Sequence, residues 1–191
     1  MALLYEMCGA RSTSGWRAVH GEDDVRTVRF PCPAGNGRGP ASELVKIYGA
    51  LLPRSKEGPG QDQGQILSDA MIERITKPAR EGMVDELQGT DTSWSLGFAL
   101  NCILSGRHAS DRAFGHGGSQ SSWAFADPEH DLAVACLCNG KPGPKAHYMR
   151  VGAVSTAIYE DLGIAASSEA DGTGRLRPRK TFQLPMGMGT F

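Results

Sequence analysis

The segment 113–140, AFGHGGSQSSWAFADPEHDLAVACLCNG, constrains the fold of this chain more than any other part. It contains strand-like runs at 113–116, 121–126 and 132–138, and only the turn-forming string DPEHD separates the last two. Parallel neighbours need a long crossover, so strands joined this closely must be antiparallel. The run LAVACLC is apolar at every position, which is typical of a central strand with both faces covered. We therefore predict an antiparallel sheet built around this segment.

Three helices are predicted around these strands. Pro40 begins the first, which ends before Pro53, and its apolar residues recur at helical spacing. Ser68 is the expected N-cap of the second, with Pro78 beyond its end. A third helix is expected from about 143 to 162, with Gly163 as its C-cap. Its predicted apolar face consists of Val151, Val154, Ile158 and Leu162.

Two further strands are predicted, one at 93–104 (SWSLGFALNCIL) and a short one at 25–30. The order helix, helix, antiparallel strands, helix indicates an α+β fold, an antiparallel sheet flanked by helices. We divide the chain into a poorly defined N-terminal segment, 1–32, a main domain, 33–164, and a tail, 165–191. The tail is rich in Ser, Gly, Pro and Arg, so we expect it to be mostly disordered.

Composition excludes several classes of function. The formal net charge is −1, which gives no electrostatic case for binding nucleic acid or a membrane surface. The basic string RLRPRK is interpreted as part of a solvated tail. The N-terminus lacks the features of a signal peptide, and LAVACLC is too short to span a bilayer. The five cysteines include no Cys-x-x-Cys pair, which favours reduced thiols in a cytoplasmic protein.

The string GHGGS, 115–119, suggests two kinds of chemistry from its residues alone. His-Gly-Gly is typical of the oxyanion loop of α/β-hydrolases, but no Gly-x-Ser-x-Gly follows it here. A metal site formed by His108, His116 and His130 is disfavoured, because no two of them have the i, i+4 spacing of a helical ligand pair. AGNGRG lacks the lysine of a phosphate-binding loop and is interpreted as a connecting loop. We predict neither a metal nor a cofactor.

Several strings, taken in order, resemble the C-terminal half of the serine β-lactamase-like family. These are PAGNGRGPASELVKIYGALL, LGFAL, FGHGGSQSSWAFADPEHDLAVACLCNG and the closing helix, together covering about 33–162. The family includes class C β-lactamases, penicillin-binding proteins, esterases and the transesterases of secondary metabolism. The resemblance implies a partial transpeptidase-like fold. It also implies acyl transfer on a small-molecule ester or amide.

The resemblance also implies roles for four residues. The family has a Lys-Thr-Gly or His-x-Gly triplet on a strand beside the active site, which here matches His116, Gly117 and Gly118. The histidine supplies a polar group near the substrate carbonyl, and the glycines leave room for substrate. The next residue, Ser119, donates its backbone N–H to the oxyanion hole. Asp127 and Pro128 are expected to form a turn and not to take part in catalysis.

The chain departs from the family pattern at the nucleophile. None of its serines is followed three residues later by lysine, and no tyrosine begins a Tyr-x-Asn motif. In the family both motifs precede the matched part, so we expect the chain to begin after them. Two hypotheses follow. The chain is either part of an acyl-transfer enzyme completed by another N-terminal half, or an inactive relative that binds a small molecule or a partner. Self-association is a further expectation.

Overall fold

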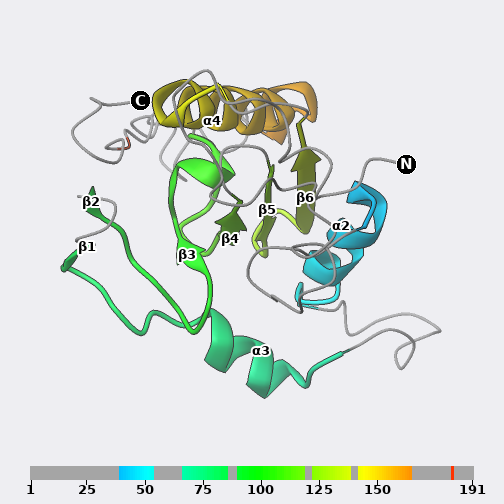
Figure 1. The fold of residues 1–191 in the computed structure, drawn as a ribbon. Coiled ribbons are helices and arrows are strands. Elements are labelled where there is room, and N and C mark those ends of the chain that lie inside the picture. Colours follow the sequence, from blue (N-terminus) through cyan, green and yellow to red (C-terminus); the bar gives the residue numbers. More distant parts are fainter. Residues whose placement is uncertain are drawn as a thin grey trace, which may run out of the picture.

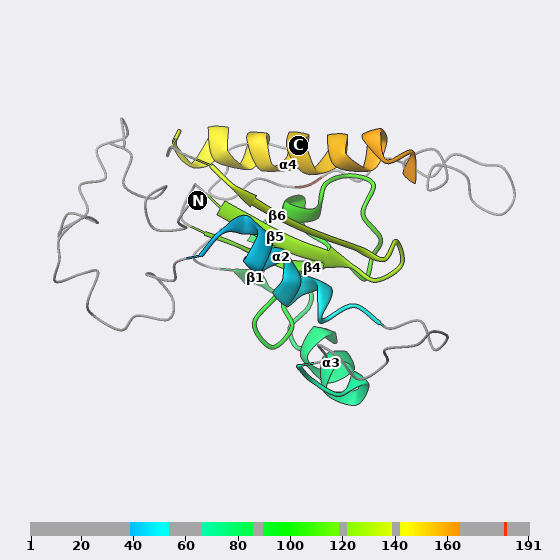
Figure 2. The same cartoon turned by 90° about the vertical axis from the view of Figure 1, so that its right-hand side faces the viewer.

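The computed structural model describes residues 39–53, 66–85, 90–118, 122–138, 142–164 and 182. They form three layers (Figures 1 and 2). The long helix α4 (Pro144–Asp161) covers one face of a four-stranded sheet. The helices α2 (Ala41–Gly49) and α3 (Asp69–Thr76) lie on the other side. The predicted α+β fold, with helices flanking an antiparallel sheet, is confirmed.

The sheet has the strand order β3-β4-β5-β6, and every neighbouring pair is antiparallel. Its strands are β3 (Ala99–Leu100), β4 (Phe114–Gly117), β5 (Ser122–Asp127) and β6 (Leu132–Leu137). The predicted hairpin is present, with Asp127 opposite Leu132 next to the turn. Among the described strands β6 stands at the end of the sheet. The central, fully buried strand is β5, contrary to the prediction for 132–138.

Strict alternation along the strands divides the apolar core in two, because neighbouring side chains point to opposite faces. Trp123 and Phe125 face α4, whereas Ala124 and Ala126 face α2 and α3. Towards α4 the buried apolar residues are Leu104, Ala109, Ala113, Trp123, Phe125, Val134, Val151 and Tyr159. Towards α2 and α3 they are Tyr48, Leu51, Ile72, Leu100, Phe114, Ala124 and Ala126. Both faces of β6 are covered, as its composition predicts.

The first two helices begin where their sequences predict. Pro40 occupies the N-cap position of α2, and the chain leaves the helix before Pro53. The Ser68 side chain caps α3 by accepting a hydrogen bond of 3.3 Å from the Met71 backbone N–H. This bond satisfies one of the N–H groups that have no partner within the helix.

The buried face of α4 agrees only in part with the predicted one. Val154 and Leu162 are 39% and 57% exposed, whereas Ser155 and Tyr159 are fully buried. Ser155 is stabilised by two hydrogen bonds, accepting from Trp123 Nε1 at 3.1 Å and donating to the Leu104 carbonyl at 2.8 Å. Satisfied polar groups are tolerated in a core, so hydrophobicity alone found only part of the stripe: Val151 is fully buried and Ile158 packs against the core, as predicted. The predicted end is confirmed, since Gly163 follows the helix with φ 71°.

The predicted strand at 93–104 is mostly absent. Only Ala99 and Leu100 form β3, and a 3₁₀ turn, η1 (Ile103–Ser105), follows. The chain turns before β3, where Ser95 Oγ accepts a hydrogen bond from the Phe98 N–H. It turns again at Asn101, whose φ of 42° lies in the left-handed region. A second small sheet, β1 (Val84–Asp85) paired with β2 (Thr90–Asp91), was not predicted.

Some predictions fall outside the described residues. They include the strand at 25–30 and the disordered tail, and the boundaries of the main domain at 33 and 164 also stay predictions. In the described part of the chain, no helix combines the length and the apolar character that crossing a bilayer requires.

Candidate active site

His116 lies near the end of β4, with its side chain exposed to solvent. It pairs with Ala124 of β5. Its ring contacts the indole of Trp94, with the ring centroids 5.7 Å apart and the planes inclined by 56°. Trp94 comes from the turn before β3, so two segments distant in sequence meet here. His116 is therefore available to a ligand.

Among the described residues, the pairing of β4 with β3 stops before His116. β3 pairs only with Phe114 and Gly115. On the other side, the Gly118 N–H donates to the Ser122 carbonyl at 2.7 Å. Backbone groups of successive residues point to opposite edges, so the Gly117 carbonyl points away from β5. His116 Nδ1 lies 2.8 Å from that carbonyl oxygen.

The glycines around His116 differ in how much space surrounds them. A Cβ atom on Gly115 would overlap the Ala124 carbonyl oxygen and lie 2.7 Å from Phe125 Cβ. A Cβ on Gly117 would come closest to the flexible end of Leu104, at 3.3 Å. A Cβ on Gly118 would overlap the Ser122 hydroxyl. Close packing of β4 on β5 thus explains Gly115, which sequence analysis did not single out.

Tyr48 of α2 packs behind His116, stacked against Phe114. Burial raises the pKa of the Tyr48 phenol to about 12, although a hydrogen bond with the His116 main chain acts in the opposite direction. The phenol is therefore neutral near pH 7 and contributes no negative charge behind the histidine. Ser119 lies outside the described residues, so its role as an oxyanion donor stays a prediction.

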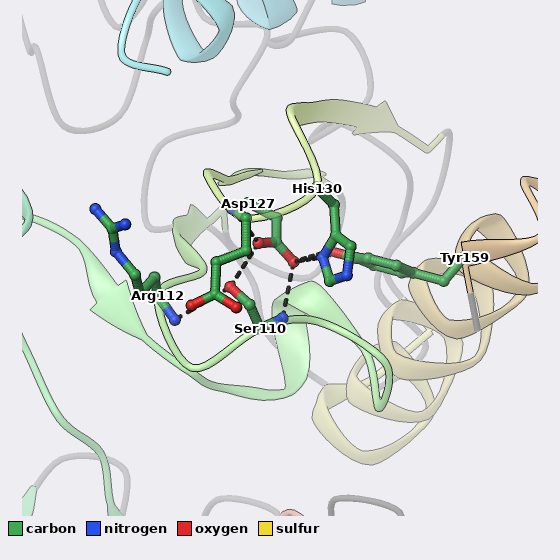
Figure 3. A network of polar contacts seen from close by, with 6 residues as sticks. Ser110, Arg112, Asp127, His130 and Tyr159 are labelled. Carbon is green, nitrogen blue, oxygen red and sulfur yellow. Dashed lines mark hydrogen bonds and ion pairs between the residues drawn. The ribbon is translucent and has the colours of Figure 1, made fainter. Parts of the chain in front are cut away.

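A second polar cluster surrounds Asp127 at the end of β5 (Figure 3). The carboxylate is fully buried. It accepts hydrogen bonds from the Ser110 N–H at 2.8 Å, the Ser110 hydroxyl at 2.5 Å and the Tyr159 hydroxyl at 2.8 Å. His130 Nδ1 lies 2.8 Å from the same carboxylate. We call Ser110, Asp127, His130 and Tyr159 the Asp127 cluster.

The Asp127 cluster has the residue types of a Ser-His-Asp triad but not its arrangement. In a triad the histidine contacts the serine and takes its proton. Here Ser110 and His130 both contact the carboxylate, and the Ser110 hydroxyl donates a hydrogen bond to Asp127 and not to the histidine. The cluster therefore joins the 105–110 segment, the hairpin turn and α4, and it does not activate a nucleophile.

The electrostatics of the cluster follow from these contacts. Burial alone would raise the pKa of Asp127, but the hydrogen bonds, those from Ser110 foremost, hold it below its usual value. Burial and the adjacent Asp127 charge raise the pKa of Tyr159. The prediction that Asp127 forms a turn is confirmed, since it accepts from the Glu129 N–H at 3.2 Å. Its second role in the core was missed, because the distant Ser110 and Tyr159 leave no local signal.

The three histidines considered as metal ligands have separate partners. His108 Nε2 lies 3.3 Å from Glu160 Oε1, His130 contacts Asp127 and His116 contacts the Gly117 carbonyl. The described residues contain no group of three or more His, Cys, Asp or Glu side chains placed to hold a metal ion. Burial raises the pKa values of Cys102 and Cys136 to about 11, so both are protonated near pH 7.

The family of the chain follows from comparison with known proteins. A profile of the beta-lactamase family matches residues 6–157. The chain belongs to the beta-lactamase family. The match begins well before residue 33, where the resemblance was placed from the sequence. No curated protein matches the chain.

Three solved structures are similar to part of this beta-lactamase family chain. A beta-lactamase from Mycobacterium bovis has 24% identity over 66% of this chain and 45% of its own, with a TM-score of 0.52. A penicillin-binding protein homologue from Caulobacter crescentus has 27% identity over 62% of this chain and 31% of its own, with a TM-score of 0.47. EstA from Arthrobacter nitroguajacolicus Rue61a has 20% identity over 65% of this chain and 33% of its own, with a TM-score of 0.47.

These comparisons bear on the fold. The family match and the Mycobacterium bovis structure confirm the partial serine β-lactamase-like fold. The aligned part spans less than half the length of each of the three structures.

Proposed function

We propose that this chain takes part in acyl transfer on a small-molecule ester or amide, as a β-lactamase-related hydrolase or transesterase. The observation that carries the proposal is the exposed His116 at the end of β4, followed by two glycines, in a chain of the beta-lactamase family. His116 would contact the substrate near its reacting carbonyl, and Gly117 and Gly118 would leave the strand end open to it.

Ser119 would supply the oxyanion donor of this site. Its backbone N–H would donate to the oxyanion that forms when the carbonyl is attacked. One such donor is worth about 2.7–4 kcal/mol of transition-state stabilisation. The reaction needs no cofactor, and we propose a cytoplasmic location, a role in secondary metabolism and no binding to nucleic acid or membrane.

The nucleophile would not be one of these 191 residues. The 191 residues contain neither Ser-x-x-Lys nor Tyr-x-Asn, so the activated serine would come from a half of the fold that lies outside these residues. The second candidate function, an inactive relative that binds a small molecule or a partner, is favoured by the same absence.

A fluorophosphonate probe tests the assignment of the nucleophile. The chain is incubated with the probe and weighed by intact-mass spectrometry. We expect no serine adduct, because without an activating base a serine hydroxyl reacts slowly. A stoichiometric adduct that is lost in a single Ser→Ala variant would show that the chain carries its own nucleophile and would contradict this assignment.

A further inference from the structure

The contact between His116 and the next residue determines which proton the imidazole carries. A carbonyl oxygen only accepts hydrogen bonds, so the nitrogen 2.8 Å from the Gly117 oxygen must donate. Nδ1 is therefore the protonated nitrogen. In the neutral ring Nε2 then has no proton and offers a lone pair.

The short length of β3 explains why this contact exists. A longer β3 would pair with Gly117 and use its carbonyl, but its pairing stops at Gly115. The freed carbonyl is instead bonded by the imidazole of its neighbour. Among the described residues no acidic side chain forms an ion pair with His116. In this tautomer Nε2 presents a hydrogen-bond acceptor to a ligand.

The neighbouring surface is apolar. Trp94 is half-buried, and its Nε1 is shut off from solvent without a hydrogen-bond partner among the described residues. The exposed part of the indole therefore consists of carbon. It lies beside the imidazole, with the ring centroids 5.7 Å apart. A flat apolar group can pack on this carbon surface while a polar group on the same ligand reaches Nε2.

We propose that Trp94 and His116 together select neutral ligands that carry a ring and a hydroxyl group. The ring packs against Trp94, and the hydroxyl donates a hydrogen bond to His116 Nε2. The inference rests on the proposed function, in which this pair would hold the alcohol part of an ester or an alcohol acceptor. Ligands with a carboxylate or an ether oxygen at that position lack the donor and bind more weakly.

The tautomer is tested first, by a long-range ¹H–¹⁵N correlation spectrum of the histidine-labelled chain. It is recorded at pH 8.5, above the usual titration range of imidazole. The His116 signals are those missing from the His116→Gln variant. We expect a protonated Nδ1 and an unprotonated Nε2. The opposite tautomer overturns the proposal.

Selectivity is tested by binding, without turnover. The probes are 2-phenylethanol and its methyl ether, which share a ring and differ in the hydroxyl donor, with phenylacetate as the anionic probe. Titrations are followed by NMR. One hydrogen bond corresponds to about a 2- to 10-fold lower Kd for the alcohol.

The variants separate the two contributions. His116→Phe removes the preference for the alcohol, whereas His116→Gln keeps it, because an amide oxygen also accepts. Trp94→Leu weakens the binding of the alcohol and of the ether to a similar extent. Equal Kd values for the two probes, or a preference that survives in His116→Phe, overturn the proposal. These measurements report binding alone, so they can support ligand selection by Trp94 and His116 even if the chain takes no part in acyl transfer. The two proposals can therefore fail separately.

Discussion

At the scale of single residues, Asp127 is the group on which most buried polar contacts converge. It is fully buried and accepts from Ser110 and Tyr159. Asp127→Asn keeps the shape of the side chain but replaces one acceptor oxygen by an amide N–H₂. The donors that faced this oxygen then lose their acceptor. We expect the free energy of unfolding to fall by about 2–4 kcal/mol. Urea unfolding measures this.

The matched control is Asp131→Asn in the same hairpin turn. Asp131 is exposed with φ 48°, a backbone conformation that asparagine tolerates. It should change the free energy of unfolding by less than about 0.5 kcal/mol. Similar losses in the two variants would mean that the turn, and not the buried cluster, is responsible.

The lowered pKa of Asp127 predicts how stability depends on acid. Its folded pKa lies below the unfolded value of about 3.9. The unfolded chain therefore binds the proton first, so this stability is complete above the unfolded pKa and is lost as pH falls through the folded pKa. Below about pH 4 the wild-type chain should lose stability more steeply than Asp127→Asn. Parallel slopes in chemical unfolding at pH 5 and pH 3 would contradict this.

His147 predicts a second pH effect, in a milder range. Burial, aided by the Arg150 charge, lowers its pKa to about 4. The unfolded chain, with a histidine pKa of about 6.5, takes up the proton first as pH falls. The contribution of neutral His147 to stability is therefore complete above about pH 6.5 and is lost towards pH 4. The loss between pH 7.5 and pH 5 should be about 2 kcal/mol larger in wild type than in His147→Phe.

The control for this effect is His116→Gln, which replaces an exposed histidine. Its pH dependence between 7.5 and 5 should follow that of the wild type much more closely than that of His147→Phe. If His147→Phe and the wild type lose stability equally, His147 is not a neutral buried group.

At the scale of elements, the contact of β4 with β5 depends on Gly115. The Cβ of an alanine there would overlap the Ala124 carbonyl oxygen, and neither backbone can move without breaking the ladder. Gly115→Ala should cost about 2–3 kcal/mol. Gly117→Ala is the matched control two residues along, because its Cβ would press only on the flexible end of the Leu104 side chain, at 3.3 Å, and make no overlap with backbone. Equal losses on urea unfolding would argue against close strand packing as the cause.

Elements that depend on neighbouring residues could be predicted from the sequence, whereas those that depend on distant contacts could not. The β5–β6 hairpin and the starts of α2 and α3 depend on neighbouring residues, so their patterns are local and were predicted correctly. The buried face of α4 depends on Ser155 and Tyr159, whose partners Leu104 and Asp127 are far away in sequence. The turn at Asn101 depends on a positive φ that periodicity does not reveal. His116 was singled out from the sequence, its role near the substrate carbonyl came only from the family resemblance, and Trp94 beside it was not predicted.

At the scale of the whole molecule, several large apolar side chains are exposed outside α4. Large apolar side chains exposed by more than half include Ile47 of α2, Val84 of β1, and Met83 and Leu96 of the connecting segments. The aligned part of the chain spans 45% of the Mycobacterium bovis structure that shares its fold. Exposed apolar surface favours association, so we expect the chain alone to be marginally stable and to dimerise or aggregate.

Light scattering combined with a thermal melt measures this expectation. Replacing Ile47 and Leu96 by Gln removes exposed apolar area without touching either buried cluster, and it should shift the chain towards monomer. The control is Val154→Gln on the exposed side of α4, which lies on the opposite face of the sheet. A wild-type monomer with a sharp transition above about 65 °C, the top of the usual mesophile range, would show that this exposed apolar surface needs no cover.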